Sequence, residues 1–205
     1  MHLPYAFQAK RMFPDVFRHD RMNTSMWPSV IEQIGEQPEK PESDDPEAIM
    51  AWEKEMDGYR RAISKTPEYM EFHKDRIEKG QRASSLIGNQ YTGSIFLALM
   101  STFESDLEDN SKLEGELFGL CGYGSGAKAK VFEGKVAPRW REVVAGWQLF
   151  ERLAGRVAID QITYENLHKG LQEESVVSPR GEFALVEIGE DGANEGARTY
   201  KWISQ

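Results

Sequence analysis

The spacing of apolar residues along the chain predicts a protein built mainly from helices, with short strands near its middle and at its end. Proline at positions 4, 14 and 28 is expected to break the aromatic-rich start, up to about residue 34, into short helices or loops. The polar, acidic and proline-spaced residues 35–45 follow. This composition predicts a surface connection or a partly disordered insertion.

Two helices are predicted after this connection. Asp45 and Pro46 suit the N-cap and the first position of the first helix. Its apolar residues recur at helical spacing and form one stripe: Ile49, Trp52, Met56, Tyr59 and Ile63. Thr66 and Pro67 begin the second helix, which Gly80 is expected to end. We interpret residues 36–80 as an acidic helical insertion, either a hairpin that covers the core or a lid or partner surface.

The third stretch combines a buried helix with a hairpin. Residues 89–103 are apolar nearly all round, which predicts a helix inside a layered protein. Residues 117–121 predict a buried strand, 122–126 a tight glycine-rich loop and 128–136 a second strand. The head of a buried helix and a loop at the end of a buried strand are places where folds commonly offer hydrogen-bond donors to a substrate. The pattern therefore favours an enzyme site.

The last stretch predicts further helices and two closing strands. An amphipathic helix is expected over residues 139–153 and a short one near Thr163, followed by strands at 182–188 and 198–203 around a flexible turn. Helices between strands indicate an α/β fold, or α+β with a mixed sheet. We expect residues 1–205 to form a single domain.

Composition narrows the class of protein. The chain has 205 residues, of which 40% are hydrophobic, enough for one sizeable core. It lacks the run of about 18 apolar residues of a membrane span and the layout of a signal peptide, so we expect a soluble, cytoplasmic protein without a membrane partner. A net charge of −9 argues against nucleic acid as the main partner. One cysteine excludes an internal disulfide framework and a multi-cysteine zinc site.

Three residues could carry chemistry, and each also has an ordinary structural interpretation. His2 precedes a proline-fixed segment but, taken alone, is only the second residue of the chain. Asn89 could simply cap a helix. Ser125 is more typical of a turn than of a nucleophile, because the Gly-x-Ser-x-Gly elbow of hydrolases would need glycine where Tyr123 stands.

Other sites are disfavoured. The glycines at 122, 124 and 126 lack the spacing of a dinucleotide fingerprint and precede a strand instead of a helix. Cys121 lies in an apolar strand without a neighbouring base, which favours a buried small hydrophobe over a thiolate. His19, His73 and His168 show no ligand spacing with each other or with carboxylates, so no metal site is expected.

Three segments, taken together and in their order along the chain, make a functional role for these residues more convincing. They are His2-Leu3-Pro4-Tyr5, Gly88-Asn89-Gln90-Tyr91-Thr92-Gly93-Ser94 and Gly119-Leu120-Cys121-Gly122-Tyr123-Gly124-Ser125-Gly126. Together they resemble the C-terminal half of hydroxymethylglutaryl-CoA synthase, a condensing enzyme of the thiolase superfamily. The Tyr-Thr-Gly-Ser continuation distinguishes the second segment from fatty-acid-type condensing enzymes. The resemblance is sharpest at the second and third segments and weakest in the acidic helical region and the last sixty or so residues.

The resemblance implies a thiolase-like α/β fold, C-terminal half only, with a mixed sheet packed by helices and an inserted helical hairpin. It implies a cytoplasmic acyltransferase of the mevalonate pathway that condenses acetyl-CoA with acetoacetyl-CoA. Coenzyme A thioesters are substrates and no cofactor is needed. By resemblance, His2 is catalytic, Asn89 and Ser125 bind the acetoacetyl group, and Arg11 with Lys10 binds the CoA phosphates. Phe7 occupies the position of a family lysine, which is a departure from the pattern.

The acylated cysteine and the catalytic glutamate of the family belong to the N-terminal half, so we expect this chain to be inactive alone. It is then a part of a longer synthase, a subunit of a split synthase, or a non-catalytic scaffold that binds thiolase-type partners. A β-branching or ketoacyl-synthase III-like enzyme, with an acyl-carrier-protein thioester as acceptor, is the alternative. The N-terminal half, in the same or a separate chain, is the expected partner, in a homo-oligomer. Apolar area around residues 95–103 should face that partner.

Overall fold

A computed structural model describes residues 7–124 and 128–204 of the chain. The chain divides into two compact units, Met1–Ala154 and Gly155–Gln205, and each is described by itself. The assignment of residues 1–205 to a single domain stays a prediction. None of the helices in the described ranges is long and apolar enough to cross a membrane.

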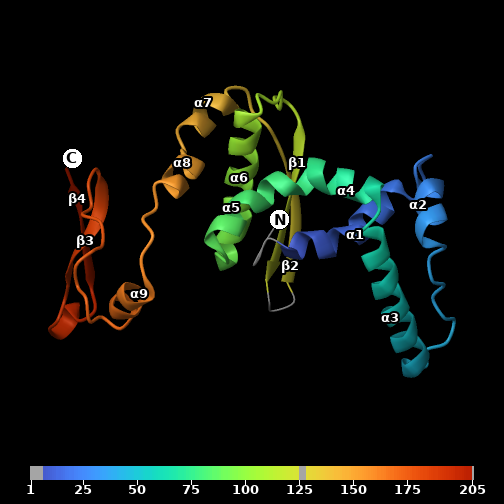
Figure 1. Cartoon of the computed structure of the whole chain (residues 1–205), viewed down its shortest axis with the longest axis horizontal. Helices are drawn as coiled ribbons and strands as arrows, with labels where there is room; N and C mark the ends of the chain where they lie inside the picture. Colours follow the sequence, from blue (N-terminus) through green and yellow to red (C-terminus); the bar gives the residue numbers. More distant parts are fainter. Residues whose placement is uncertain (1–6, 125–127, 205) are drawn as a thin grey trace. The chain divides into compact units, whose positions relative to one another are not determined.

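Helices dominate the first unit (Figure 1). They are α1 (Phe7–Arg21), α2 (Trp27–Ile34), α3 (Pro46–Ile63), α4 (Pro67–His73), α5 (Lys79–Ile87), α6 (Ser94–Glu108), α7 (Trp140–Ala145) and α8 (Leu149–Ala154). A π-helical segment, Lys74–Glu78, joins α4 to α5, and a 3₁₀ turn, Tyr91–Gly93, leads into α6. Strands β1 (Leu117–Gly124) and β2 (Lys128–Lys135) form an antiparallel hairpin.

The predicted starts of α3 and α4 are confirmed. Asp45 accepts a hydrogen bond from the Glu47 N–H at 3.2 Å, and the Thr66 hydroxyl accepts one from the Tyr69 N–H at 3.3 Å. Such side-chain caps satisfy N–H groups that have no partner within the first helical turn. The connection before α3, residues 35–45, has no regular secondary structure, as expected.

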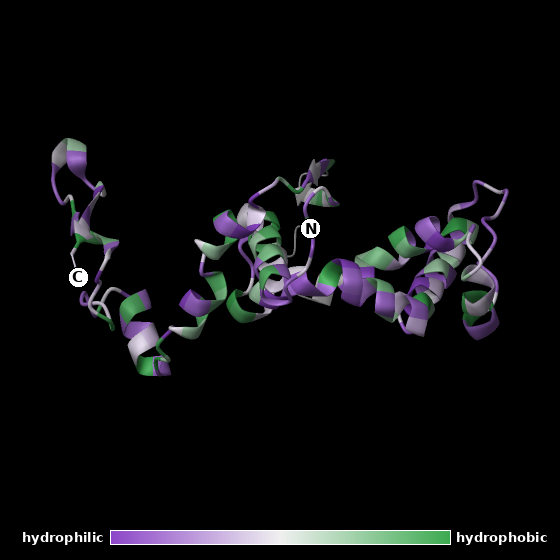
Figure 2. Cartoon of the chain, turned by 90° about the horizontal axis from the view of Figure 1, so that it is seen from above, coloured by the Kyte–Doolittle hydropathy of each residue, from purple (hydrophilic) through white to green (hydrophobic). Residues whose placement is uncertain are grey.

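The helices α1 to α4 share one hydrophobic cluster. Phe17 lies at its centre and makes edge-to-face contacts with Tyr69 and Phe72, at centroid distances of 5.5 and 5.3 Å. The C-terminal part of the predicted α3 stripe, Met56, Tyr59 and Ile63, is buried here. Figure 2 shows hydrophilic and hydrophobic residues interleaved along these helices, as expected for amphipathic elements. The predicted helical pair thus builds a core with α1 and α2 instead of lying over one.

Pro14 does not break the first helix, contrary to the prediction. It lies fully buried inside α1, where a proline lacks the N–H that would bond to the carbonyl four residues earlier. That carbonyl belongs to Lys10, and it accepts a hydrogen bond from the Tyr69 hydroxyl at 2.7 Å. A side chain of α4 therefore satisfies the carbonyl that Pro14 leaves without a donor, and burial raises the pKa of Tyr69, which keeps its hydroxyl protonated.

This arrangement predicts an energetic coupling between Tyr69 and Pro14. Tyr69→Phe should lower the free energy of unfolding by about 1–3 kcal/mol, because it leaves the Lys10 carbonyl without a donor. In a Pro14→Ala background the helix supplies the missing N–H, so the same substitution should lower stability markedly less. Urea unfolding of the two single variants and the double variant measures the coupling. Equal effects of Tyr69→Phe in both backgrounds would contradict it.

Gly80 does not end the second predicted helix either. The helix runs on through α5 and ends at Gly88, whose φ of 91° suits glycine. Gly80 instead allows α5 to approach α6 closely: a Cβ there would lie 3.2 Å from Thr102 Oγ1 and 3.5 Å from the Ala98 carbonyl oxygen. A glycine inside this helix therefore serves packing.

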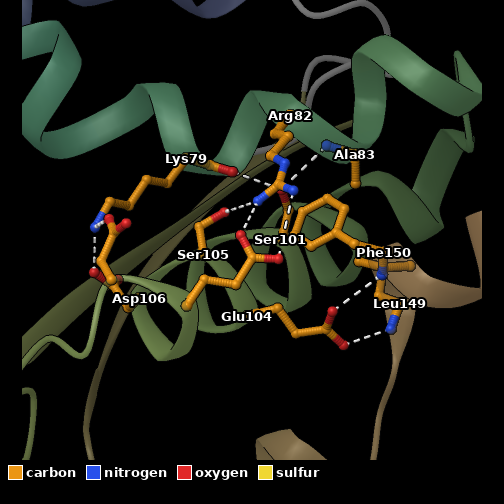
Figure 3. Close-up of polar contacts among 11 residues, drawn as sticks. Lys79, Arg82, Ala83, Ser101, Glu104, Ser105, Asp106, Leu149 and Phe150 are labelled. Atoms are coloured by element: carbon orange, nitrogen blue, oxygen red, sulfur yellow. Dashed lines mark hydrogen bonds and ion pairs between the residues drawn. The ribbon is translucent and has the colours of Figure 1, made fainter. Parts of the chain in front are cut away.

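A hydroxyl of α6 is bonded into the backbone of α5. Ser101, which is fully buried, donates to the Lys79 carbonyl at 2.5 Å and accepts from the Ala83 N–H at 3.1 Å (Figure 3). These two backbone groups are four residues apart, so Ser101 bridges one turn of the neighbouring helix. The side of α6 that faces α5 is thus lined by small residues and a hydroxyl, whereas Phe96 is 62% exposed. The predicted helix exists, but it is not buried all round.

The β1/β2 hairpin packs on the other side of α6. Phe118 of β1 meets Phe103 of α6 edge to face, with ring centroids 5.5 Å apart, and Val136, Trp140 and Val144 extend this second cluster. β1 continues to Gly124, three residues beyond the predicted strand. The predicted helix over residues 139–153 is two helices, α7 and α8, because Gln148 adopts a positive φ of 55° between them.

The second unit holds α9 (Gln161–His168), β3 (Glu182–Ile188) and β4 (Arg198–Ile203). Asp160 caps α9 by accepting from the Thr163 N–H at 2.7 Å. The two strands have the predicted bounds and pair antiparallel. In the described parts of the chain, all strand pairing therefore occurs within two separate antiparallel hairpins.

Candidate functional site

The candidate site is the loop between α5 and α6, residues 88–94. Its backbone is held by two side chains: Asn89 Oδ1 accepts from the Tyr91 N–H at 2.7 Å, and Ser94 Oγ accepts from the Gln90 N–H at 3.2 Å. Ser94 is fully buried, so the loop is anchored to the interior at the start of α6. Asn89 itself is exposed and closes a turn before the 3₁₀ segment instead of capping α6.

The turn uses the side-chain carbonyl oxygen of Asn89 but not its NH₂ group. Its carbonyl oxygen is committed to the backbone, while none of the described residues accepts from its amide NH₂ group. A side-chain amide carries two donors that do not titrate. Asn89 can therefore donate hydrogen bonds to an oxygen of a bound molecule while its own position is fixed by the turn.

Tyr91 adds backbone strain to the same loop. Its φ of 48° lies in the left-handed region, which is uncommon for a residue with a bulky side chain. Strained conformations of this kind concentrate at functional sites and persist where the surrounding structure holds them. Here the holding groups are Asn89 and Ser94, on either side of the strained residue.

The glycine-rich strand lies against the first turn of α6. A Cβ at Gly122 would lie 3.8 Å from Cδ1 of Ile95 and 3.7 Å from the Lys130 carbonyl oxygen. The structure thus places the glycine strand against Ile95, the residue that follows the second sequence motif, in the first turn of α6. Cys121 points to the opposite face of the hairpin, since side chains alternate along a strand, and it is half-buried.

The basic candidates lie on α1, which belongs to the same unit. Phe13 of α1 packs with Ile77 and Ala98, which links α1 to α6. Lys10 is half-buried on α1, and Arg11 is exposed, with no ion pair to any described carboxylate. Burial lowers the pKa of His73 and the nearby charge of Lys10 lowers it further, while Glu78 and a hydrogen bond with Gln81 raise it.

His2 and Ser125 lie outside the described residues, so their predicted roles stay predictions. The predicted convergence of His2, Asn89 and Ser125 on one pocket stays a prediction for the same reason. The structure describes three of the five predicted site residues: Asn89 in the loop before α6, and Lys10 and Arg11 on α1.

Glu104 is a buried residue that the sequence interpretation missed. It is 8% exposed on α6, and its two carboxylate oxygens accept from the N–H groups of Leu149, at 2.6 Å, and Phe150, at 3.1 Å (Figure 3). It therefore caps α8 from 45 residues away. The sequence offers one signal for this role, an acidic residue directly after Phe103 at the end of the apolar stretch.

The fold places the chain in a structural class. MvaS in complex with 3-hydroxy-3-methylglutaryl coenzyme A matches 98% of this chain with a TM-score of 0.64 and 22% identity, over 40% of the MvaS chain. PksG, a synthase from Bacillus subtilis, matches 72% of this chain with a TM-score of 0.54, over 40% of its own length. The fold is thus that of the thiolase-like hydroxymethylglutaryl-CoA synthases, as predicted, over less than half of those proteins.

The sequence comparison identifies the family. The family described as hydroxymethylglutaryl-coenzyme A synthase C terminal matches residues 39–179, and the chain belongs to it. The Haloferax volcanii hydroxymethylglutaryl-CoA synthase is 26% identical over 208 residues, which is 98% of this chain and 45% of that protein. The Enterococcus faecalis enzyme is 35% identical over 95 residues, 44% of this chain and 22% of its own. The chain thus spans about half the length of the first of these relatives.

Proposed function

We propose that this chain is the part of a hydroxymethylglutaryl-CoA synthase that holds the acetoacetyl thioester. In the full reaction, the acetyl group of acetyl-CoA is transferred to a cysteine and its methyl carbon is then joined to acetoacetyl-CoA. Water releases 3-hydroxy-3-methylglutaryl-CoA from that cysteine. The cysteine and the glutamate that acts on the acetyl methyl group lie outside this chain. The observation that carries the proposal is the NH₂ group of Asn89, from which none of the described residues accepts, in the loop that precedes α6.

Each residue has a role that suits its chemistry. Asn89 donates to an oxygen of the acetoacetyl group, and Ser125 with the glycine loop contacts the same group. His2 donates a hydrogen bond or a proton to the acetoacetyl carbonyl oxygen, where negative charge develops as the new bond forms. Arg11 and Lys10 contact the CoA phosphates, and the lack of a carboxylate partner for Arg11 among the described residues is compatible with that.

A β-branching synthase is the second candidate. The curacin biosynthetic pathway HMG synthase, solved in complex with an acetyl donor-ACP, matches 76% of this chain with a TM-score of 0.52 and 22% identity. An acceptor thioester on an acyl carrier protein is therefore the alternative to acetoacetyl-CoA, and isoprenoid formation through mevalonate applies only to the CoA form. Parallel assays with both acceptors separate the two. A scaffold without catalysis is disfavoured, because it has no use for Asn89 amide donors from which none of the described residues accepts.

The division of labour gives a direct test. This chain alone should show no acetoacetyl-CoA-dependent release of free CoA from acetyl-CoA, because it carries no acylated cysteine. Co-expression with the amino-terminal part of MvaS, the part that precedes the matched segment, should produce that release. The measurement is a thiol assay with and without acetoacetyl-CoA. Turnover by this chain alone would refute the proposal.

A further inference from the structure

The hairpin of the second unit has two chemically different faces. Directly opposite residues of an antiparallel pair share a face, and neighbours along a strand alternate. Phe183 pairs with Trp202, with ring centroids 5.3 Å apart, and Leu185 pairs with Tyr200. The opposite face carries polar pairs such as Ala184 with Lys201 and Glu187 with Thr199. The hairpin is therefore amphipathic, with one aromatic face.

A bulge preserves the aromatic face to the end of the strand. The register shifts between Leu185 and Glu187, which leaves Val186 as the extra residue. Without that shift, Glu187 would follow Leu185 onto the aromatic face. With it, Glu187 joins the polar face and Ile188 pairs with Arg198 on the aromatic one. β-bulges re-orient side chains in this way, so the bulge maintains the aromatic face along the strand pair.

Residues 155–204, the described part of the second unit, leave this face uncovered. The exposed fractions are 69% for Phe183, 43% for Leu185, 52% for Ile188, 54% for Tyr200 and 57% for Trp202, and none of the unit's described residues is buried. An isolated two-stranded hairpin is marginally stable at best in water. Contiguous exposed apolar surface is rare on monomeric proteins, and aromatic residues are enriched where such surface forms an interface.

Full-length relatives contain further polypeptide that is available to cover the face. The Haloferax volcanii synthase and MvaS each align with 98% of this chain, a share that must include most of the β3/β4 hairpin. Both proteins continue over more than half of their length outside the aligned part. A second copy of this chain is a poorer occupant, because each copy carries a net charge of −9 and like charges oppose association.

We propose that the aromatic face of the β3/β4 hairpin, formed by Phe183, Leu185, Ile188, Tyr200 and Trp202, is a docking surface. Its occupant is the polypeptide that corresponds to the remaining, amino-terminal part of a full-length synthase, in the same or a separate chain. The inference rests on the proposed function, and it assigns to the hairpin a contact distinct from the Asn89 site. The aromatic side chains supply the buried anchors of that contact.

Two neighbouring residues of β4 provide a matched test. Tyr200→Glu places a carboxylate on the aromatic face, and Lys201→Glu places the same group on the polar face of the same strand, opposite Ala184, where the residue is also exposed. The tagged full chain is co-expressed with the amino-terminal part of MvaS, and the apparent Kd and copurified yield are measured. We expect Tyr200→Glu to weaken binding at least about tenfold and Lys201→Glu to change it by no more than about twofold.

The outcomes separate this inference from the proposed function. If Tyr200→Glu weakens copurification but the wild-type mixture releases no CoA, the docking surface is supported and the proposed function is overturned. The docking surface is overturned if the wild-type chain fails to copurify or if both variants bind equally well. CoA release by the wild-type mixture supports the proposed function in either case. A lower melting temperature of the Tyr200→Glu chain alone would show that the face packs within one copy. Conversion of a dimer of this chain to a monomer would assign the face to self-association. Either result overturns the proposal.

Discussion

Asn89→Asp is expected to lower kcat/KM of the reconstituted synthase by about 10²–10³-fold while leaving the chain folded. The aspartate keeps an oxygen at the position that accepts from the Tyr91 N–H, so the turn is retained. It lacks the NH₂ donors and places a negative charge where the acetoacetyl oxygen becomes negative. A carboxylate before the first turn of α6 is also compatible with the helix dipole. Condensation should therefore fail without a loss of stability.

Two further variants distinguish the loss of the Asn89 donors from an effect of added charge or of a disturbed turn. Gln90→Glu adds the same charge one residue later, at an exposed side chain, and should retain most of the activity. Asn89→Ala removes both the donors and the turn contact, so it should lower activity and also lower the free energy of unfolding by about 1 kcal/mol. Full activity of Asn89→Asp would show that Asn89 is only a turn residue. Equal losses in Asn89→Asp and Gln90→Glu would assign the effect to charge.

The parts of the fold that could be predicted from sequence are those that depend on local signals. The caps Asp45 and Thr66 stand immediately before prolines, and both helices begin where this pattern indicates. The strands β3 and β4 have the predicted bounds because alternating apolar residues and glycine-rich turns delimit them. In each case the residues that give the signal lie next to the element whose end they define.

The wrong predictions share a different cause. Pro14 and Gly80 are helix breakers by propensity, yet each lies inside a helix. For Pro14, a distant residue supplies the missing hydrogen-bond donor. For Gly80, a distant helix occupies the space that a side chain would fill. Tyr69 of α4 donates to the carbonyl freed by Pro14, and α6 lies where a side chain of residue 80 would stand. A single sequence does not show which distant segment will be the neighbour, so local propensity had no means to indicate these exceptions.

The candidate site was predictable to a similar extent. The motif around Asn89 is contiguous, so its place before the buried helix could be expected from sequence, whereas the structural role expected of Asn89 was a helix cap and the structure shows a turn. The commitment of the Asn89 oxygen to Tyr91, which leaves only donors for a ligand, depends on the turn geometry and became clear only in the structure. The cap that Glu104 provides for α8 depends on a contact across 45 residues and was not predicted.

Glu104→Ala is expected to lower the free energy of unfolding by about 2–5 kcal/mol, the largest stability effect we predict. The substitution leaves the N–H groups of Leu149 and Phe150 without an acceptor in a largely buried position. Phe150 also carries the guanidinium of Arg82 over its ring, 3.6 Å from the ring centroid, so loss of α8 would disturb the α5/α6 pair as well. Glu104→Gln keeps one oxygen acceptor and should lower stability by roughly half as much.

Glu108→Ala is the matched control, because Glu108 lies one turn later on α6 and is exposed. Its ion pair with Arg82 is a surface contact, so its removal should change stability by at most about 1 kcal/mol. Thermal and urea unfolding of the variants measures the difference. Since α8 begins only because Glu104 accepts its first N–H groups, Glu104→Ala should also lower helical circular dichroism before global unfolding. Equal unfolding midpoints for Glu104→Ala and Glu108→Ala would show that α8 is held by Phe150 packing alone, without the carboxylate.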